Sequence, residues 1–239
     1  MLINPIFERL NLLIGNEALE KLANTKVLVF GAGGVGSWAA EALVRSGIGK
    51  IGIIDNDIIC KSNINRQVEA TSLTIGEPKA TTLKKRLLEI NPDCEVTSWD
   101  ELFCYDNINL FDINSSDFVI DAIDSLNHKL NLIEFVYNAG ITLYSSMGMA
   151  LKIDPTLIKI GSIWKTAGCP LARLVRQGLR TRNFQGDFTA VFSTEVQQNK
   201  IMAIPSRDSK PVNGSIVTVT ATAGFYLANL VINQVINKK

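Results

Sequence analysis

Histidine is almost absent from this 239-residue sequence, and cysteine is scarce. The single histidine, His128, leaves little room for a Ser-His-Asp or Cys-His catalytic pair. The four cysteines, Cys60, Cys94, Cys104 and Cys169, form no C-x-x-C pair. We therefore expect neither a structural zinc site nor a disulfide framework, and a reduced, cytoplasmic setting is the simplest expectation.

The chain also lacks a large net charge and a leader-like N-terminus. The formal net charge is +1, so any contact with nucleic acid has to come from a local basic patch. Residues 1–13 contain no basic start followed by an apolar block, so we expect no signal peptide. Residues 216–236 are apolar but include several threonines and asparagines. Their polarity favours a buried helix or an oligomer interface over a membrane span, and membrane association stays an open alternative.

Apolar residues make up 46% of the chain, and in its first half strand-like runs alternate with helical ones. This alternation predicts an α/β fold, a Rossmann-like doubly wound and mostly parallel sheet. The helix that begins at Pro78 is expected to turn its basic residues, Lys79 among them, outward. The predicted strands are 26–31, 50–55, 95–98, 118–121 and 142–146, and the predicted helices are 34–46, 78–90 and 126–138.

The pattern changes after Gly148. Residues 157–163 and 188–194 resemble antiparallel strands around a basic helix, and residues 204–214 are expected to form an exposed loop. We therefore expect a C-terminal antiparallel extension of the sheet. The predicted organisation is a single domain over 1–239, with a nucleotide-binding half over 1–150 and an elaboration for substrate and dimer contacts over 151–239.

A glycine-rich turn follows the first predicted strand. Gly31, Gly33 and Gly36 have the G-x-G-x-x-G spacing of a nucleotide-binding βα unit. Glycine lets the backbone turn sharply and approach a phosphate, and the free N–H groups of the following helix face the anion. The spacing also occurs in enzymes that bind NAD or FAD, so it predicts a nucleotide without identifying it.

Charged residues after the second strand fit such a site. Asp55 closes the strand 19 residues after Gly36 and can accept hydrogen bonds from ribose hydroxyls. Asp57 could serve the same site or cap the next turn. Arg66 could bind a triphosphate or be a solvated loop residue. Lys79 stands at a helix N-terminus, where a cation is poorly placed unless an anion lies beside it.

Two aspartates follow the predicted strand 118–121. Ligands of open α/β sheets bind outside the carboxyl ends of the strands, so Asp124 is placed to hold Mg²⁺ that bridges phosphates. Asp121 lies nearer the strand interior and is expected to be structural. Alternatively, either aspartate caps the helix that begins near Leu126.

A basic helix face is the best candidate for contact with RNA. Arg173, Arg176 and Arg180 recur at helical spacing and could bind RNA phosphates or form a solvated face. Cys169 precedes this helix at a position where a thiolate would be favoured, and its role stays open.

Together, the motifs GAGGVGS (31–37), DND (55–57), SNINRQ (62–67), PK (78–79) and DAID (121–124) resemble the ubiquitin-activating-enzyme-like adenylyltransferases, which include the ThiF and MoeB proteins. Further motifs resemble the tRNA threonylcarbamoyladenosine dehydratases of that superfamily. They are INPDC (90–94), IDAIDS (120–125), IDPT (153–156), CPLAR (169–173) and FSTE (192–195).

The resemblance implies that ATP activates a carboxylate as an acyl-adenylate. In the dehydratases that carboxylate belongs to threonylcarbamoyladenosine in tRNA, and an attack from within the same modification then closes a ring and expels AMP. It further implies a homodimer in which Arg9 reaches the neighbouring subunit's phosphates, and it leaves the binding of an alkali metal ion open. By motif, the expected ATP-binding residues are Gly31, Gly33, Gly34, Gly36, Asp55, Asp57, Asn63, Arg66, Gln67, Lys79, Asp124 and Ser125, with Arg9, Arg66, Lys79 and Asp124 catalytic and Asp124 holding Mg²⁺.

Two alternatives remain at this stage. One is an adenylyltransferase that activates the C-terminus of a ubiquitin-like sulfur carrier, and the other is an NAD-binding oxidoreductase. The chain lacks the two C-x-x-C pairs typical of MoeB-type enzymes, and it has no cysteine in residues 205–214. Both departures weaken thioester or persulfide chemistry and suit an intramolecular cyclisation.

Overall fold

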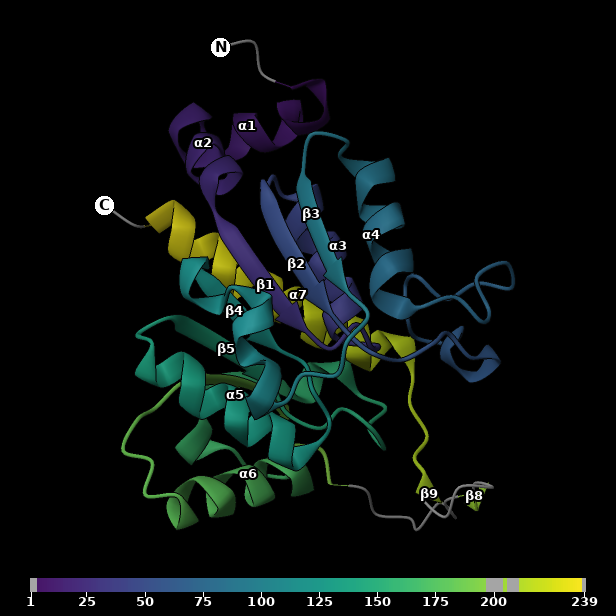
Figure 1. Cartoon of the computed structure of the whole chain (residues 1–239), viewed down its shortest axis with the longest axis vertical. Helices are drawn as coiled ribbons and strands as arrows, with labels where there is room; N and C mark the ends of the chain where they lie inside the picture. Colours follow the sequence, from purple (N-terminus) through teal and green to yellow (C-terminus); the bar gives the residue numbers. More distant parts are fainter. Residues whose placement is uncertain (1–3, 197–203, 206–210, 238–239) are drawn as a thin grey trace.

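A seven-stranded sheet with helices on both faces forms the centre of the molecule (Figure 1). The structure, a computed structural model, describes residues 4–196, 204–205 and 211–237. The strand order is β3-β2-β1-β4-β5-β7-β6, and every neighbouring pair is parallel except β6 with β7. The strands are β1 (Lys26–Phe30), β2 (Lys50–Ile54), β3 (Glu95–Trp99), β4 (Phe118–Asp121), β5 (Thr142–Ser146), β6 (Ile158–Ser162) and β7 (Thr189–Ser193). The predicted doubly wound sheet with an antiparallel extension is confirmed.

Seven α-helices and six 3-10 helices accompany the sheet in the described residues. The α-helices are α1 (Glu8–Ile14), α2 (Asn16–Asn24), α3 (Gly36–Arg45), α4 (Lys79–Ile90), α5 (Leu126–Asn138), α6 (Pro170–Thr181) and α7 (Val217–Asn237). The 3-10 helices are η1 (Pro5–Phe7), η2 (Lys61–Asn63), η3 (Tyr105–Phe111), η4 (Ile113–Ser115), η5 (Pro155–Leu157) and η6 (Ile163–Lys165).

The region expected to be a loop over 204–214 contains a small strand pair. Two short strands, β8 (Ile204–Pro205) and β9 (Pro211–Val212), pair antiparallel, so the expectation of a plain loop is wrong there. Each strand is only two residues long and holds a proline, which is why the sequence carries no alternating strand pattern. Residues 206–210 lie outside the described part of the chain.

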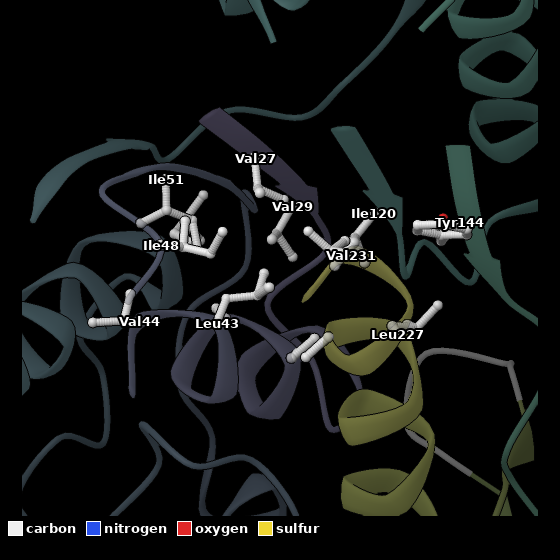
Figure 2. Close-up of a cluster of buried hydrophobic side chains, with 14 of the residues drawn as sticks. Val27, Val29, Leu43, Val44, Ile48, Ile51, Ile120, Tyr144, Leu227 and Val231 are labelled. Atoms are coloured by element: carbon white, nitrogen blue, oxygen red, sulfur yellow. The ribbon is translucent and has the colours of Figure 1, made fainter. Parts of the chain in front are cut away.

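Alternate residues of β1 face two separate apolar layers. Val27 and Val29 pack with buried residues of α3, α4 and α7, whereas Leu28 and Phe30 pack with η3, α5 and α6. Figure 2 shows the first layer, in which Leu43 of α3 and side chains of α7 meet the sheet residues. Because both faces are covered, the parallel strands are almost continuously apolar, as buried strands are.

Helix α7 is the apolar segment that raised the question of a membrane span. It is long and apolar enough to cross a membrane by length and composition alone. It runs along the sheet beside α3 (Figure 1), and half of its most apolar 18-residue stretch is buried inside the molecule. At Gly224 a Cβ would stand 2.5 Å from the Val35 carbonyl oxygen, so α7 packs closely against the start of α3. A buried helix was one of the two structures predicted for this segment from its polar residues, and α7 packs in that way.

The strand order reverses between β1 and β4. From β1 the chain proceeds outward to β2 and β3, and then returns to place β4 on the other side of β1. Helices on opposite faces leave the two strand ends at such a point, which opens a crevice at the carboxyl edge of the sheet. The turn after β1 and the segment after β4 therefore meet at this switch point.

Candidate active site

The turn between β1 and α3 is packed too tightly for side chains at two of its glycines. Gly31 has φ +94°, and a Cβ there would stand 2.8 Å from the Ala122 carbonyl oxygen. A Cβ on Gly36 would stand 1.8 Å from the Gly31 carbonyl oxygen. These approaches close the turn on itself and bring the segment after β4 against it. The glycine spacing is thus explained by the backbone geometry.

The open side of the same turn suits an anion. Helix α3 begins at Gly36 without a side-chain cap; the Ser37 N–H donates to the Gly33 carbonyl oxygen (3.1 Å), whereas the Gly36 N–H has no partner among the described residues and is available to a ligand. A Cβ on Gly33 would meet only the Gln67 amide nitrogen, 3.9 Å away. On Gly34 a Cβ would stand 3.1 Å from Arg66 Cγ. The turn therefore has room over Gly33 for a phosphate, with an arginine beside Gly34.

Asp55 is held against the glycine turn by backbone donors. Its Oδ2 accepts a hydrogen bond from the Ala32 N–H (2.7 Å), and its Oδ1 accepts one from the Asp57 N–H (2.8 Å). Burial raises the pKa of the Asp55 carboxyl, and the nearby Lys79 ammonium partly opposes that rise. The carboxylate keeps further lone pairs on both oxygens and stands beside the turn, which suits the expected ribose contact.

Lys79 is buried rather than turned outward, so that expectation is wrong. Only 6% of its side chain is exposed, and Nζ lies 2.7 Å from Asp57 Oδ2. The Asp57 carboxylate that it contacts is 63% exposed. A buried ammonium at a helix N-terminus needs such an anionic partner. Asp57 is therefore the partner of Lys79, and its assignment to the nucleotide site stays a prediction.

The loop between β2 and α4 is held in place by its own amides and by α3. Asn63 is buried, and its side-chain oxygen accepts from the Cys60 N–H (2.8 Å). Arg66 donates to the Ser62 carbonyl oxygen (2.8 Å), while its own carbonyl accepts from the indole of Trp38 (2.9 Å). Gln67 is 5% exposed, and its Oε1 has no hydrogen-bond partner in the described part of the chain. The amide nitrogen of the same side chain lies 3.9 Å from the position of a Cβ on Gly33, so the Gln67 side chain stands beside the glycine turn.

The two aspartates after β4 have different surroundings. Asp121 is fully buried, and its Oδ2 accepts from Lys129 Nζ (2.6 Å) and from the Ser145 hydroxyl (2.6 Å). It is structural, as expected. Asp124 is exposed and has no hydrogen-bond or ion-pair partner among the described residues. The N-cap of α5 is Ser125, whose side chain makes no capping bond either.

The chemistry of this edge fits a magnesium ion held mainly by phosphates. The described residues contain no group of three or more His, Cys, Asp or Glu side chains that could hold a metal alone. Mg²⁺ in nucleotide sites commonly takes one or two carboxylates and completes its shell with phosphate oxygens and water. Asp124 offers one unengaged carboxylate on the segment after β4, where the Ile123 backbone nitrogen would lie 3.3 Å from a Cβ on Gly31.

Arg9 lies far from the glycine turn of its own chain. Helix α1 covers the opposite end of the sheet from that turn (Figure 1), and Leu10 lies 3.8 Å from the position of a Cβ on Gly47, which precedes β2. A five-residue strand separates the two edges by about 16 Å. Arg9 is exposed and has no partner in the described residues. This position fits a residue that acts on a neighbouring subunit.

The three arginines of α6 do not form one uniform face. Arg176 is half-buried and donates to the Thr166 carbonyl oxygen (3.0 Å). Arg180 lies over the Trp164 ring, 5.5 Å from its centroid. Arg173 is exposed with no partner in the described part of the chain. Arg173 and Arg180 are therefore accessible for an anion, whereas Arg176 secures the start of its own helix.

Glu69, a buried acidic residue two positions after Gln67, was not singled out from the sequence. It is a charged residue between the buried apolar Val68 and Ala70, and only 2% of it is exposed. Its two apolar neighbours were the available signal that Glu69 is buried. Burial of an acidic residue is notable, because such residues are almost never fully buried without a partner.

A glycine turn at the switch point of a doubly wound sheet, with acidic and basic side chains converging on it, defines a nucleotide-binding α/β enzyme. The chain belongs to the ThiF family, whose model matches residues 7–239. It is 42% identical over 189 residues, 79% of this chain and 74% of the relative, to the tRNA threonylcarbamoyladenosine dehydratase of Bacillus subtilis (strain 168). The family resemblance drawn from the motifs is confirmed.

Solved structures agree with this assignment. The Escherichia coli tRNA N6-threonylcarbamoyladenosine dehydratase in complex with ATP superposes with a TM-score of 0.88 at 35% identity, covering 98% of this chain and 97% of the other. The same enzyme in complex with AMP gives a TM-score of 0.87 at 35% identity with the same coverage. These similarities confirm the predicted fold over nearly the whole chain.

Proposed function

We propose that this chain catalyses the ATP-dependent dehydration of threonylcarbamoyladenosine in tRNA, through an acyl-adenylate. The observation that carries the proposal is the glycine turn at the β1–β4 switch point, with the Gln67 side chain beside Gly33 and an unengaged Asp124 on the segment whose backbone packs against Gly31. The names of the relatives supply the substrate, and the site supplies the residues for a nucleoside triphosphate.

The first chemical step is attack of the substrate carboxylate on the α-phosphorus of ATP, which forms the acyl-adenylate and releases pyrophosphate. The turn at Gly33 and the start of α3 bind phosphate through N–H groups, and Asp55 binds the ribose. Arg66 and Lys79 neutralise charge that develops on the phosphates. Mg²⁺, held by Asp124, would add charge neutralisation there when bound.

The second step closes a ring within the modified nucleoside. A nucleophilic atom of the same modification attacks the activated carbonyl, and AMP leaves with one of the former carboxylate oxygens. That oxygen, together with two protons, accounts for the one water that the nucleoside loses. No histidine is needed for this chemistry, because AMP is already a good leaving group and the two reacting groups are held in one molecule.

The functional unit that we propose is a homodimer in the cytoplasm, where tRNA is available. Helix α1 carries Arg9 together with the exposed Leu12 and Leu13, of which 83% and 81% of the surface is accessible. Two adjacent leucines so exposed favour a protein contact on this helix. In the proposed dimer, Arg9 reaches the neighbouring subunit's phosphates. Arg173 and Arg180 supply a local cationic surface for tRNA.

One experiment tests the activity. The protein is incubated with ATP, Mg²⁺ and tRNA that carries threonylcarbamoyladenosine, and the digested nucleosides are analysed by mass spectrometry. We expect loss of one water from the nucleoside, and when the carboxylate is labelled with ¹⁸O, one label in AMP. Unchanged nucleoside would contradict the proposal. ATP–pyrophosphate exchange that depends on the C-terminus of a ubiquitin-like protein would favour the sulfur-carrier alternative instead.

A further inference from the structure

A cavity of about 540 Å³ is lined by α5 and by the 3-10 helices η3 and η4, and none of its residues belongs to the nucleotide site described above. Its volume is within the range of small-ligand sites, roughly 300–1,000 Å³. The lining combines three carboxamides, one carboxylate and two aromatic rings, and therefore offers both hydrogen-bonding groups and flat surfaces. The residues are Tyr105, Asn114, Asn131, Glu134, Phe135, Asn138 and Ala139.

Arg182, which directly follows α6, fixes two of these side chains. Its Nη1 donates to Asn131 Oδ1 (2.8 Å) and to Glu134 Oε2 (2.6 Å). Asn131 Nδ2 and Glu134 Oε1 have no hydrogen-bond partner among the residues that the structure describes. Because residues three apart on a helix are neighbours, α5 presents a free donor beside a free acceptor at the cavity wall.

The rest of the lining adds a ring and further amides. Tyr105 is 68% exposed, so its ring is accessible for stacking. The carboxamides of Asn114 and Asn138 are also without a hydrogen-bond partner in the described part of the chain. An unpaired nucleobase has the matching chemistry, since it has a flat π surface and carries donors and acceptors side by side on one edge. Aromatic side chains stack on such bases, and amide and carboxylate groups hydrogen-bond to their edges.

The cavity lies close to the groups that we assign to the substrate. Helix α5 begins two residues after Asp124, and Asn131 lies about 8 Å along that helix from its start. Helix α6, which carries Arg180 and leads to Arg182, packs beside α5 (Figure 1). Within the described residues only Nη1 of Arg182 is engaged, so its other nitrogens can meet a phosphate of the same RNA strand.

We propose that this cavity receives an unpaired nucleobase of the substrate tRNA, from a nucleotide close to the threonylcarbamoyladenosine. The inference rests on the proposed function, which makes tRNA the substrate. The base stacks on Tyr105, and its edge pairs with Asn131 and Glu134. Arg182 neutralises the Glu134 carboxylate, which would otherwise repel the RNA phosphates. The contact adds affinity for the RNA and leaves ATP binding unaffected.

The double variant Tyr105→Ala with Asn131→Ala removes the ring and the donor. We expect it to bind the modified tRNA about tenfold more weakly, the effect of losing one stacked base, with unchanged affinity for ATP. Asn229→Ala, at an exposed site of α7 on the other face of the sheet, is the matched control and is expected to keep the wild-type tRNA affinity. Thermal melting establishes that both variants are folded.

A set of tRNAs, each with one nucleotide near the modification replaced by an abasic residue, tests the contact directly. In the wild type, one abasic position is expected to weaken binding about tenfold. In the double variant the same position should cause no further loss, because that base has no cavity contact left to lose.

Wild-type affinity of the folded double variant, or independent losses at every abasic position, would overturn the proposal. If the double variant does not fold, the wild type alone decides, because abasic tRNAs that all bind as well as the intact tRNA would also overturn it. Failure of the proposed function is distinguishable, since the wild type would then form no product from modified tRNA. Product formation without the coupling counts against the cavity alone.

Discussion

The Asp124 carboxylate is exposed at the carboxyl edge of the sheet and has no hydrogen-bond or ion-pair partner among the described residues. Its removal is therefore expected to leave the fold unchanged and to act only on catalysis. We expect Asp124→Ala to lower the rate of adenylation by roughly a hundredfold or more, the effect of losing one group that stabilises phosphate charge. Pyrophosphate release with modified tRNA measures it. Asp106→Ala, at another exposed aspartate, is the matched control, and near-normal turnover of Asp124→Ala would contradict the role.

Asp121 lies three residues before Asp124 in the sequence, yet it is fully buried and forms an ion pair with the buried Lys129. Asp121→Asn would leave that ammonium without a counter-charge in the core. Breaking such a buried pair costs about 3–5 kcal/mol of unfolding free energy, which urea denaturation measures. Glu17→Gln, which breaks the exposed pair with Lys21, is expected to change stability by no measurable amount. A stability loss as small in Asp121→Asn would show that the buried pair is not structural.

At the scale of elements, the glycine turn contains one glycine that packing requires, Gly36, and one that we expect only phosphate binding to require, Gly33. A Cβ on Gly36 has no room, whereas one on Gly33 meets only a distant amide nitrogen. We expect Gly36→Ala to be strongly destabilised and Gly33→Ala to keep its stability within about 1 kcal/mol. Gly33→Ala should still bind ATP roughly tenfold to a hundredfold more weakly, because a methyl group would displace a phosphate from its N–H donors. Thermal melts and calorimetry measure the two effects; wild-type ATP affinity in Gly33→Ala would contradict this account of the turn.

The helices and strands over residues 26–146 were predictable from the pattern of apolar residues. The helix and strand boundaries from 26 to 146 follow buried apolar runs and caps such as Gly47, and they agree with the sequence prediction within two residues. Helices α1 and α2 and the long η3 were not predicted, although α2 has an amphipathic sequence with Ala18 and Leu22 buried. The burial of Lys79 was also missed. Its partner, Asp57, lies 22 residues away, and only the tertiary fold brings the two charges together.

Helix α6 presents two arginines rather than three to solvent. We expect Arg173→Gln with Arg180→Gln to weaken tRNA binding without changing ATP affinity. The slope of log affinity against log salt should fall by about one unit for each lost phosphate contact. The tRNA affinity, measured across a series of salt concentrations, gives this slope. The double variant Lys84→Gln with Lys85→Gln on α4 is the charge-matched control. Identical slopes for wild type and variant would show that this face is only solvated.

At the scale of the whole molecule, the sheet keeps Arg9 and the glycine turn at opposite edges. In the homodimer that we propose, Arg9 of one subunit serves the glycine turn of the other subunit, next to that subunit's own Arg66. The same arrangement explains why α1 leaves Leu12 and Leu13 exposed in a single chain. The amino-edge helices are then part of the catalytic unit although they lie far from their own site.

Subunit complementation tests that arrangement. Arg9→Ala and Arg66→Ala are each expected to be inactive, because every site in either homodimer lacks one arginine. In a mixed dimer the Arg9 of one subunit meets the Arg66 of the other, so one of the two sites is complete. Random exchange of equal amounts puts half of the molecules into mixed dimers with one active site each, and we expect about a quarter of wild-type activity. Native mass spectrometry establishes that exchange has occurred. If the exchanged sample stays inactive, Arg9 serves its own chain or has no part in the reaction, and the two-chain site is wrong.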